Sequence, residues 1–124
     1  MNIVASTVVF TVDDPAGSRR FFTTHLGFRE VLDTPDFTWL SRDDAVADIL
    51  LHQRDLERPQ ERIAQPVMTF AVTDLAKEYT RLRAESAPIT GQLWRNPWGE
   101  RLVRLTDPNG IVVELTEWIA PSGA

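Results

Sequence analysis

The stretch TVVFTVDD, Thr7–Asp14, decides the fold because it returns sixty residues later as VMTFAVTD, Val67–Asp74. In both copies apolar residues alternate along a run typical of a β-strand, and the run ends in an aspartate. Asp13 or Asp14 followed by Pro15 is typical of the start of a helix. A repeat of this length that occurs only twice is not a solenoid, so the chain consists of two similar halves.

Each copy continues with a helix and three further strands. The first helix carries Phe21, Phe22 and Leu26 on one side and is expected to end at Gly27. The expected strands are Phe28–Asp33, Phe37–Ser41 and Ala47–Gln53 in the first copy, and Pro88–Trp94, Gly99–Thr106 and Gly110–Trp118 in the second. The sequence therefore predicts an α+β fold of two βαβββ repeats, with a curved mixed sheet around a cleft and the helices outside.

The repeat also divides the chain. Residues 1–124 are expected to form one domain, with a first half at 1–56, a linker at 57–66 and a second half at 67–124. The polar, proline-bounded segment Arg54–Pro66 supports the position of the linker.

Alternation in the four key strands predicts which side chains face the helices. The uniformly apolar set is Val8, Phe10, Val12, Ile49, Leu51, Met68, Phe70, Val72, Val113 and Leu115. The opposite set is mixed: Thr7, Val9, Thr11, Asp48, Leu50, His52, Val67, Thr69, Ala71, Val112, Glu114 and Thr116. We expect the first set to pack under the helices and the second to line the cleft.

The composition excludes several classes of binding partner and of chemical site. The 13 basic and 18 acidic residues give a net charge of −5, which argues against a surface for nucleic acid or an anionic membrane. The absence of cysteine excludes disulfides, thiolate metal sites and a cysteine nucleophile. MNIVASTVVF at the start has no basic segment typical of a signal peptide, and no apolar run reaches the roughly 20 residues that cross a bilayer. A cytoplasmic protein is expected.

Three segments together resemble a known family. They are TVVFTVDDPAGSRRFFTTHLGF near the start, VMTFAVTD at the repeat and PWGERLVRLTDPNGIVVELTE near the end. The combination resembles the vicinal oxygen chelate superfamily, which includes glyoxalase, extradiol dioxygenases, fosfomycin resistance enzymes and bleomycin resistance proteins.

The resemblance implies a metal site whose ligands are missing here. Enzymes of the superfamily hold one divalent metal through His, Gln or Glu side chains, and the corresponding positions are Thr7, Leu50, Val67 and Glu114. Only Glu114 suits a transition metal. The chain is therefore most similar to the metal-free, bleomycin-resistance-like branch, whose members are acidic homodimers that sequester a compound. A rearranged site of His52, Asp48 and Glu114 stays open as an alternative.

Glu114 interrupts the apolar run GIVVELTEW and needs a partner. Arg104, or less readily Arg101, is a candidate for an ion pair that would satisfy this carboxylate without a metal. Glu114 is otherwise a hydrogen-bond acceptor for a ligand, or a general base.

The tryptophans are candidates for stacking on a flat ligand. Trp94 and Trp98 lie in the loop-like stretch LWRNPWG, whereas Trp39 lies on a short strand where core packing is the simpler interpretation. The predicted ligand-binding residues are Glu114, Trp98, Trp94, His52, Trp39, Thr7, Leu50, Val67 and Arg104.

The predicted function is a metal-free, antibiotic-resistance-type binding protein that uses no cofactor. It would sequester a small aromatic or cationic compound in the cleft of a homodimer. The alternatives are a glyoxalase-like lyase or isomerase, or a dioxygenase-related enzyme, with an altered metal site, and an interaction module without a ligand.

Overall fold

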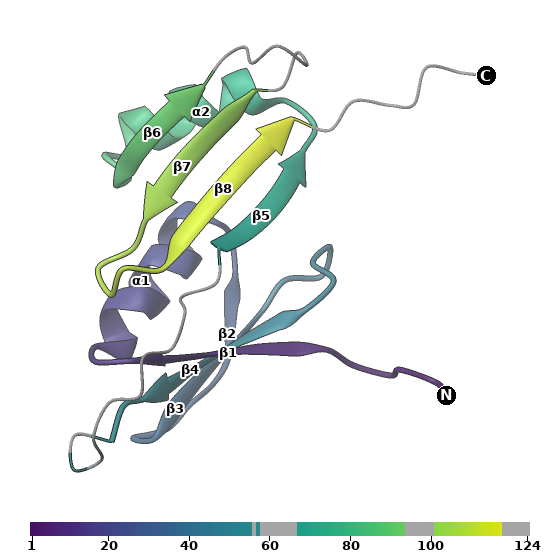
Figure 1. Ribbon diagram of the computed structural model, residues 1–124, viewed down its shortest axis with the longest axis vertical. Coiled ribbons are helices and arrows are strands. Elements are labelled where there is room, and N and C mark those ends of the chain that lie inside the picture. The colour runs from purple at the N-terminus through teal and green to yellow at the C-terminus, as the bar shows by residue number, and fades with distance from the viewer. Residues whose placement is uncertain (56, 58–66, 94–100, 118–124) are drawn as a thin grey trace. The chain divides into compact units, whose positions relative to one another are not determined.

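The computed structural model describes residues 1–55, 57, 67–93 and 101–117. The chain divides into two compact units, Met1–Ile63 and Ala64–Ala124, and each contains one βαβββ repeat (Figure 1). Each repeat forms its own four-stranded mixed sheet with a helix packed against it. The α+β prediction of two βαβββ repeats is thus confirmed.

The first unit orders its strands β1-β4-β3-β2. Its elements are β1 (Thr7–Val12), α1 (Pro15–His25), β2 (Arg29–Asp33), β3 (Phe37–Ser41) and β4 (Asp48–Gln53). Strand β4 pairs in parallel with β1 and antiparallel with β3. Helix α1 contacts β2, β3 and β4, so it covers one face of this sheet.

The second unit repeats this arrangement with the order β5-β8-β7-β6. Its elements are β5 (Val67–Val72), α2 (Leu75–Ala84), β6 (Ile89–Leu93), β7 (Leu102–Thr106) and β8 (Val112–Glu117). Strand β8 pairs in parallel with β5 and antiparallel with β7, and α2 contacts β7 and β8. We call the face of each sheet that lies opposite its helix the open face.

Burial follows the predicted alternation. The helix-facing side chains are buried or half-buried, with Ile49, Leu51 and Val113 fully enclosed. The mixed set contains no buried side chain. The core of each unit therefore lies between its helix and its sheet.

Both helices begin at the expected aspartates. The Asp14 carboxylate accepts a hydrogen bond of 3.2 Å from the Gly17 amide, and Asp74 accepts one of the same length from the Lys77 amide. Each cap satisfies one amide that a helix start leaves without a partner. At the end of α1, Gly27 has a φ of +70°, a conformation that glycine adopts without strain.

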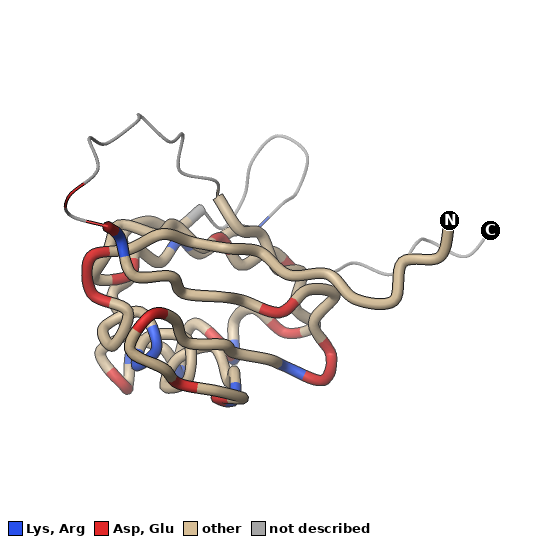
Figure 2. The backbone as a smooth tube through the Cα atoms, turned by 90° about the horizontal axis from the view of Figure 1, so that it is seen from below, with Lys and Arg blue, Asp and Glu red and all other residues tan. Residues whose placement is uncertain are grey.

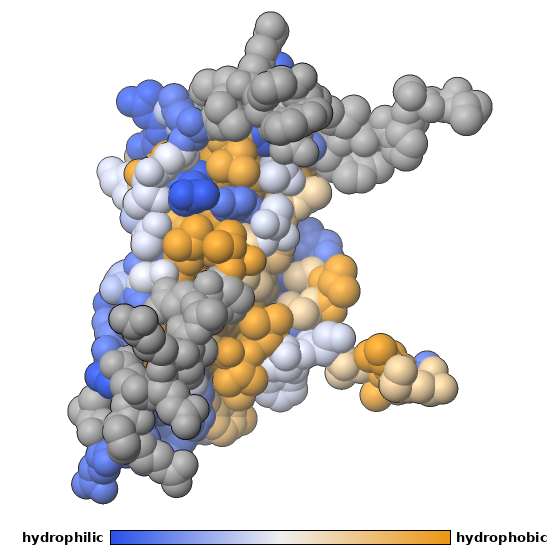
Figure 3. Space-filling model, viewed as in Figure 1, coloured by the Kyte–Doolittle hydropathy of each residue, from blue (hydrophilic) through white to orange (hydrophobic). Residues whose placement is uncertain are grey.

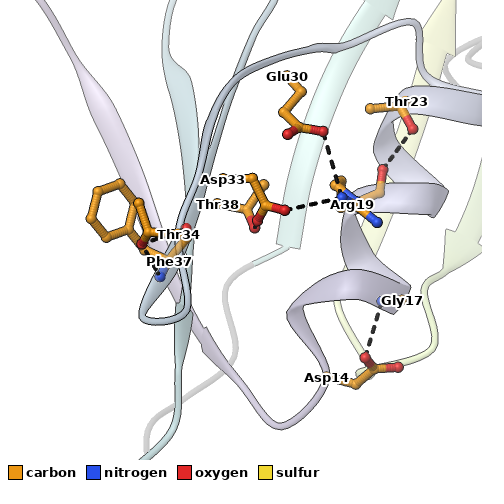
Figure 4. Close-up of polar contacts among 9 residues, drawn as sticks. All are labelled: Asp14, Gly17, Arg19, Thr23, Glu30, Asp33, Thr34, Phe37 and Thr38. Atoms are coloured by element: carbon orange, nitrogen blue, oxygen red, sulfur yellow. Dashed lines mark hydrogen bonds and ion pairs between the residues drawn. The ribbon is translucent and has the colours of Figure 1, made fainter.

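A polar cluster ties α1 to β2 (Figure 4). Arg19 lies 3.2 Å from Asp33 and 3.6 Å from Glu30, and the other oxygen of Asp33 accepts a 2.7 Å hydrogen bond from the buried Thr38 hydroxyl. These contacts fix the helix to the edge of its sheet.

The strands β2 and β6, each at one of the two edges of its sheet, share an irregularity. The pairing of β2 with β3 shifts between Glu30 and Leu32, and that of β6 with β7 shifts between Ile89 and Gly91. Each shift is a β-bulge that places one extra residue, Val31 or Thr90, in the edge strand.

The last strand starts two residues later than predicted. Asp107, Asn109 and Gly110 form a turn in which the Asp107 carboxylate accepts hydrogen bonds from the Asn109 and Ile111 amides. Gly110 has a φ of +85°. This turn keeps residues 110 and 111 out of the ladder, and β8 begins at Val112.

Helices α1 and α2, of 11 and 10 residues, are the helices in the described ranges, and neither is long and apolar enough to span a membrane. Acidic residues recur along the described backbone (red in Figure 2), in keeping with the net charge of −5.

Candidate functional site

A polar row crosses the open face of the second sheet. The strand register places Thr69 beside Glu114, Glu114 beside Arg104, and Arg104 beside Gly91. Residues directly opposite each other in a sheet point to the same face. We call Thr69, Glu114, Arg104 and Gly91 the polar row.

An ion pair lies at the centre of the polar row. Arg104 Nη2 lies 2.6 Å and Arg104 Nε 3.2 Å from Glu114 Oε1. The Glu114 side chain is 18% exposed, whereas that of Arg104 is 50% exposed. Of the two candidate partners, Arg104 is thus the one that pairs with Glu114, and Arg101 instead lies 3.6 Å from Glu117. Glu114 Oε2 has no hydrogen-bond partner among the described residues, so it can accept one from a ligand.

The open face of the first sheet carries an apolar row at the strand positions equivalent to those of the polar row. The register places Val9 beside Leu50, Leu50 beside Trp39, and Trp39 beside Leu32. Val9 is 55%, Leu32 46% and Trp39 37% exposed, and Leu50 is half-buried. We call Val9, Leu50, Trp39 and Leu32 the apolar row. Figure 3 shows hydrophobic side chains at the surface over the strands of this unit.

One carboxylate holds the tryptophan of the apolar row. Trp39 Nε1 donates a 2.9 Å hydrogen bond to Asp48 Oδ2, and Ser41 Oγ donates one of 2.8 Å to Asp48 Oδ1. Both oxygens of Asp48 are therefore occupied by neutral donors. The indole is fixed in orientation while part of its surface stays exposed, so Trp39 is not the enclosed core residue that the simpler interpretation required.

The positions that correspond to the superfamily's metal ligands do not fit a metal. Leu50 and Val67 have no donor atom, Thr7 is exposed beside Asp48, and Glu114 is bound to Arg104. One carboxylate alone does not provide the three or four ligands that such a metal needs. Nor do three His, Asp or Glu side chains come together as a metal site within the described ranges.

Of the remaining candidate residues, the structure describes only His52. His52 lies on β4 between Thr11 and Phe37 and is exposed on the open face of the first sheet. Trp94, Trp98 and most of the expected linker, 57–66, fall outside the described residues. The ligand-binding role of each predicted residue stays a prediction.

Sequence reasoning did not single out Asp48 and Leu32 as part of one cluster with Trp39. Trp39 and Asp48 are nine residues apart on neighbouring strands, and only the register shows that they meet. The one available signal was the acidic residue Asp48 directly before the apolar run Ile49–Leu51.

Comparison with known families gives a match over most of the chain. The model of the Glyoxalase/Bleomycin resistance protein/Dioxygenase superfamily matches residues 5–115. A comparison with curated proteins gives no match.

Solved structures share the fold at low sequence identity. Lactoylglutathione lyase from Agrobacterium tumefaciens is 23% identical with a TM-score of 0.72, and 94% of each chain is covered. A superfamily member from Sphaerobacter thermophilus is 21% identical with a TM-score of 0.71, over 95% of this chain and 99% of the other. TioX from Micromonospora sp. ML1 is 20% identical with a TM-score of 0.71, over 94% and 100%. At these identities the likeness shows the fold alone. The family match, together with the paired βαβββ repeats, establishes that this chain belongs to the glyoxalase/bleomycin resistance protein/dioxygenase superfamily.

Proposed function

We propose that this protein binds a small organic compound without a metal ion and sequesters it, as a homodimer in the cytoplasm. The ligand class is aromatic or cationic, as in the bleomycin-resistance-like branch of the superfamily. A resistance role through capture of a toxic compound follows from this activity.

The ion pair between Arg104 and Glu114 carries the proposal. Glu114 is the one superfamily metal position with a suitable side chain, and it already has a cationic partner at 2.6 Å. A metal would compete with that guanidinium and would find no donor at Leu50 or Val67. The same pair offers an organic ligand both an acceptor, Glu114 Oε2, and the exposed part of a guanidinium.

The rival function is a glyoxalase-like lyase or isomerase in which Glu114 is the general base. Its support is the oxygen Oε2, which has no hydrogen-bond partner among the described residues. Against it, Oε1 already accepts two hydrogen bonds from Arg104, so this oxygen is engaged by a guanidinium rather than directed at a substrate.

Calorimetric titration of the chelator-stripped protein with nickel, zinc, manganese and ferrous ions tests the metal-free state. We expect no stoichiometric binding. Tight binding at one ion per chain would overturn the proposal and favour the enzyme. A screen of aromatic and cationic compounds by tryptophan quenching then tests ligand binding, and quenching that saturates is the expected result.

Sedimentation equilibrium tests the dimer separately. Exposed apolar side chains outside the apolar row, at Val31, Val46 and Val67, support self-association, since apolar surface is covered when subunits pair. A mass of one chain, 14.1 kDa, across the micromolar range would contradict this part of the proposal while leaving ligand binding intact.

A further inference from the structure

We infer that the open face of the first sheet is the ligand platform, and that it selects a planar aromatic cation that stacks on Trp39 with its positive charge near Asp48. The inference rests on the proposed function and deepens it. It assigns cation recognition to Asp48 and leaves Glu114 without that role.

The first argument concerns charge. Glu114 has a guanidinium at 2.6 Å, so its negative charge is already compensated. Asp48 accepts hydrogen bonds from an indole and a hydroxyl, which are both neutral, and no Lys, Arg or His of the described residues forms an ion pair with it. Of these two carboxylates, Asp48 is therefore the one that still attracts a cation.

The second argument concerns the shape of the platform. Val9, Leu50, Trp39 and Leu32 follow one another across all four strands of a pleated sheet, so they provide a broad apolar surface. Three of them are more than a third exposed. A flat ring system covers such a surface better than a branched or strongly hydrated molecule does.

The third argument concerns the orientation of the indole. The bond from Trp39 Nε1 to Asp48 Oδ2 fixes the ring, and the bond from Ser41 fixes the carboxylate in turn. A fixed aromatic ring loses little conformational entropy when a ligand stacks on it. An aromatic ring also attracts a cation placed over its face, so Trp39 and Asp48 act on the same ligand.

Among the described residues, the matching row of the second sheet provides no such platform. This row is Thr69, Glu114, Arg104 and Gly91, which has no aromatic side chain and no net charge. The two repeats have thus diverged in the chemistry of their open faces.

The probes are two acridines of similar shape and opposite charge, 9-aminoacridine as the cation and acridine-9-carboxylate as the anion. Their affinities for the full chain are measured by calorimetry at physiological salt. We expect the wild type to bind the cation at least about tenfold more tightly, since one well-placed carboxylate discriminates between the charges. Trp39→Leu should weaken both probes about three- to tenfold through lost stacking, whereas Trp39→Phe should restore most of the affinity.

Asp48→Asn is the decisive variant, and Asp43→Asn is its matched control. Both remove one negative charge from the same unit, but the Asp43 side chain is 92% exposed and interacts with Arg29 rather than with the platform. Asp48→Asn should abolish most of the preference for the cation, and Asp43→Asn should leave it within about twofold. Thermal unfolding by circular dichroism verifies that each variant is folded.

The outcomes separate this inference from the proposed function. If both probes bind but Trp39→Leu and Asp48→Asn leave affinity and preference unchanged, the platform is wrong and metal-free binding elsewhere stands. If neither probe binds the wild type, the ligand class inferred here is wrong. Metal binding in the earlier titration would overturn the proposed function by itself.

Discussion

Leu50 and Glu114 occupy the same place in the two repeats, one apolar and one charged. Leu50 lies on β4 between Val9 and Trp39, and Glu114 lies on β8 between Thr69 and Arg104. Both strands pair in parallel on one side and antiparallel on the other. The fold therefore holds two equivalent positions, and the side chain present at each determines the chemistry of that open face.

The ion pair on the second sheet should contribute measurably to stability. We expect Arg104→Met to lower the free energy of unfolding by about 1 kcal/mol, because Glu114 is mostly buried and loses its partner. A double-mutant cycle with Glu114→Gln, measured by urea denaturation, isolates the coupling. The matched control is Arg101 with Glu117, which are 3.6 Å apart and should couple more weakly. Equal coupling in both pairs would contradict the assigned geometry.

Adjacent leucines on β4 should respond differently to truncation. Leu51 is fully buried against the helix, so Leu51→Ala should cost roughly 2–5 kcal/mol. Leu50 lies on the open face, and Leu50→Ala should cost about 1 kcal/mol or less. Equilibrium denaturation of the two variants measures the difference. A larger loss at Leu50 than at Leu51 would show that the assignment of the faces is wrong.

The two helix caps should contribute similar amounts to the free energy of unfolding. Asp14→Ala and Asp74→Ala each remove an oxygen that accepts a backbone amide at 3.2 Å, and each should cost about 1 kcal/mol. Denaturation followed by far-ultraviolet circular dichroism checks both. Asp36→Ala is the control, because it removes an exposed turn carboxylate that caps no helix and should change stability little.

The loop after β3 should give a small dependence of stability on pH. Hydrogen bonds from Arg42 hold the pKa of Asp44 below its usual value. A carboxylate whose pKa is lowered by folding stabilises the protein above its unfolded pKa of about 3.9 and loses this contribution as the pH falls through the folded pKa. Wild type should thus exceed Asp44→Asn slightly in thermal stability at pH 7, with the gap closing in acid.

Salt provides the check on this prediction. Asp44 is exposed, so its attraction to Arg42 is screened and should weaken in concentrated salt. The difference in thermal stability between wild type and Asp44→Asn should therefore shrink at low pH and in high salt. If it persisted unchanged under both conditions, the ion pair would be ruled out as its cause.

The sequence predicted the two repeats because their signal is local. TVVFTVDD and VMTFAVTD carry strand alternation and a helix cap within eight residues, and both strands and both caps form as expected. The sequence also provided Arg104 as one of two candidate partners for Glu114, since an acid in an apolar strand needs a partner and the preceding predicted strand carries Arg101 and Arg104.

The apolar row could not be predicted from the sequence. Its four members come from four strands, and their meeting depends on register, which the bulge at Val31 shifts by one residue. Alternation in FREVLD, followed without the bulge, does not show which of Val31 and Leu32 faces Trp39. The bond from Trp39 to Asp48 depends on the same register.

The bulges in β2 and β6 have a consequence for solubility at high concentration. A regular edge strand presents a continuous line of amides and carbonyls on which strands of other molecules can add without limit. The extra residue in each bulge breaks that line and increases the local twist. At its β2 or β6 edge each sheet is thus a poor template for fibril growth, which protects on that side a chain whose open faces expose apolar side chains.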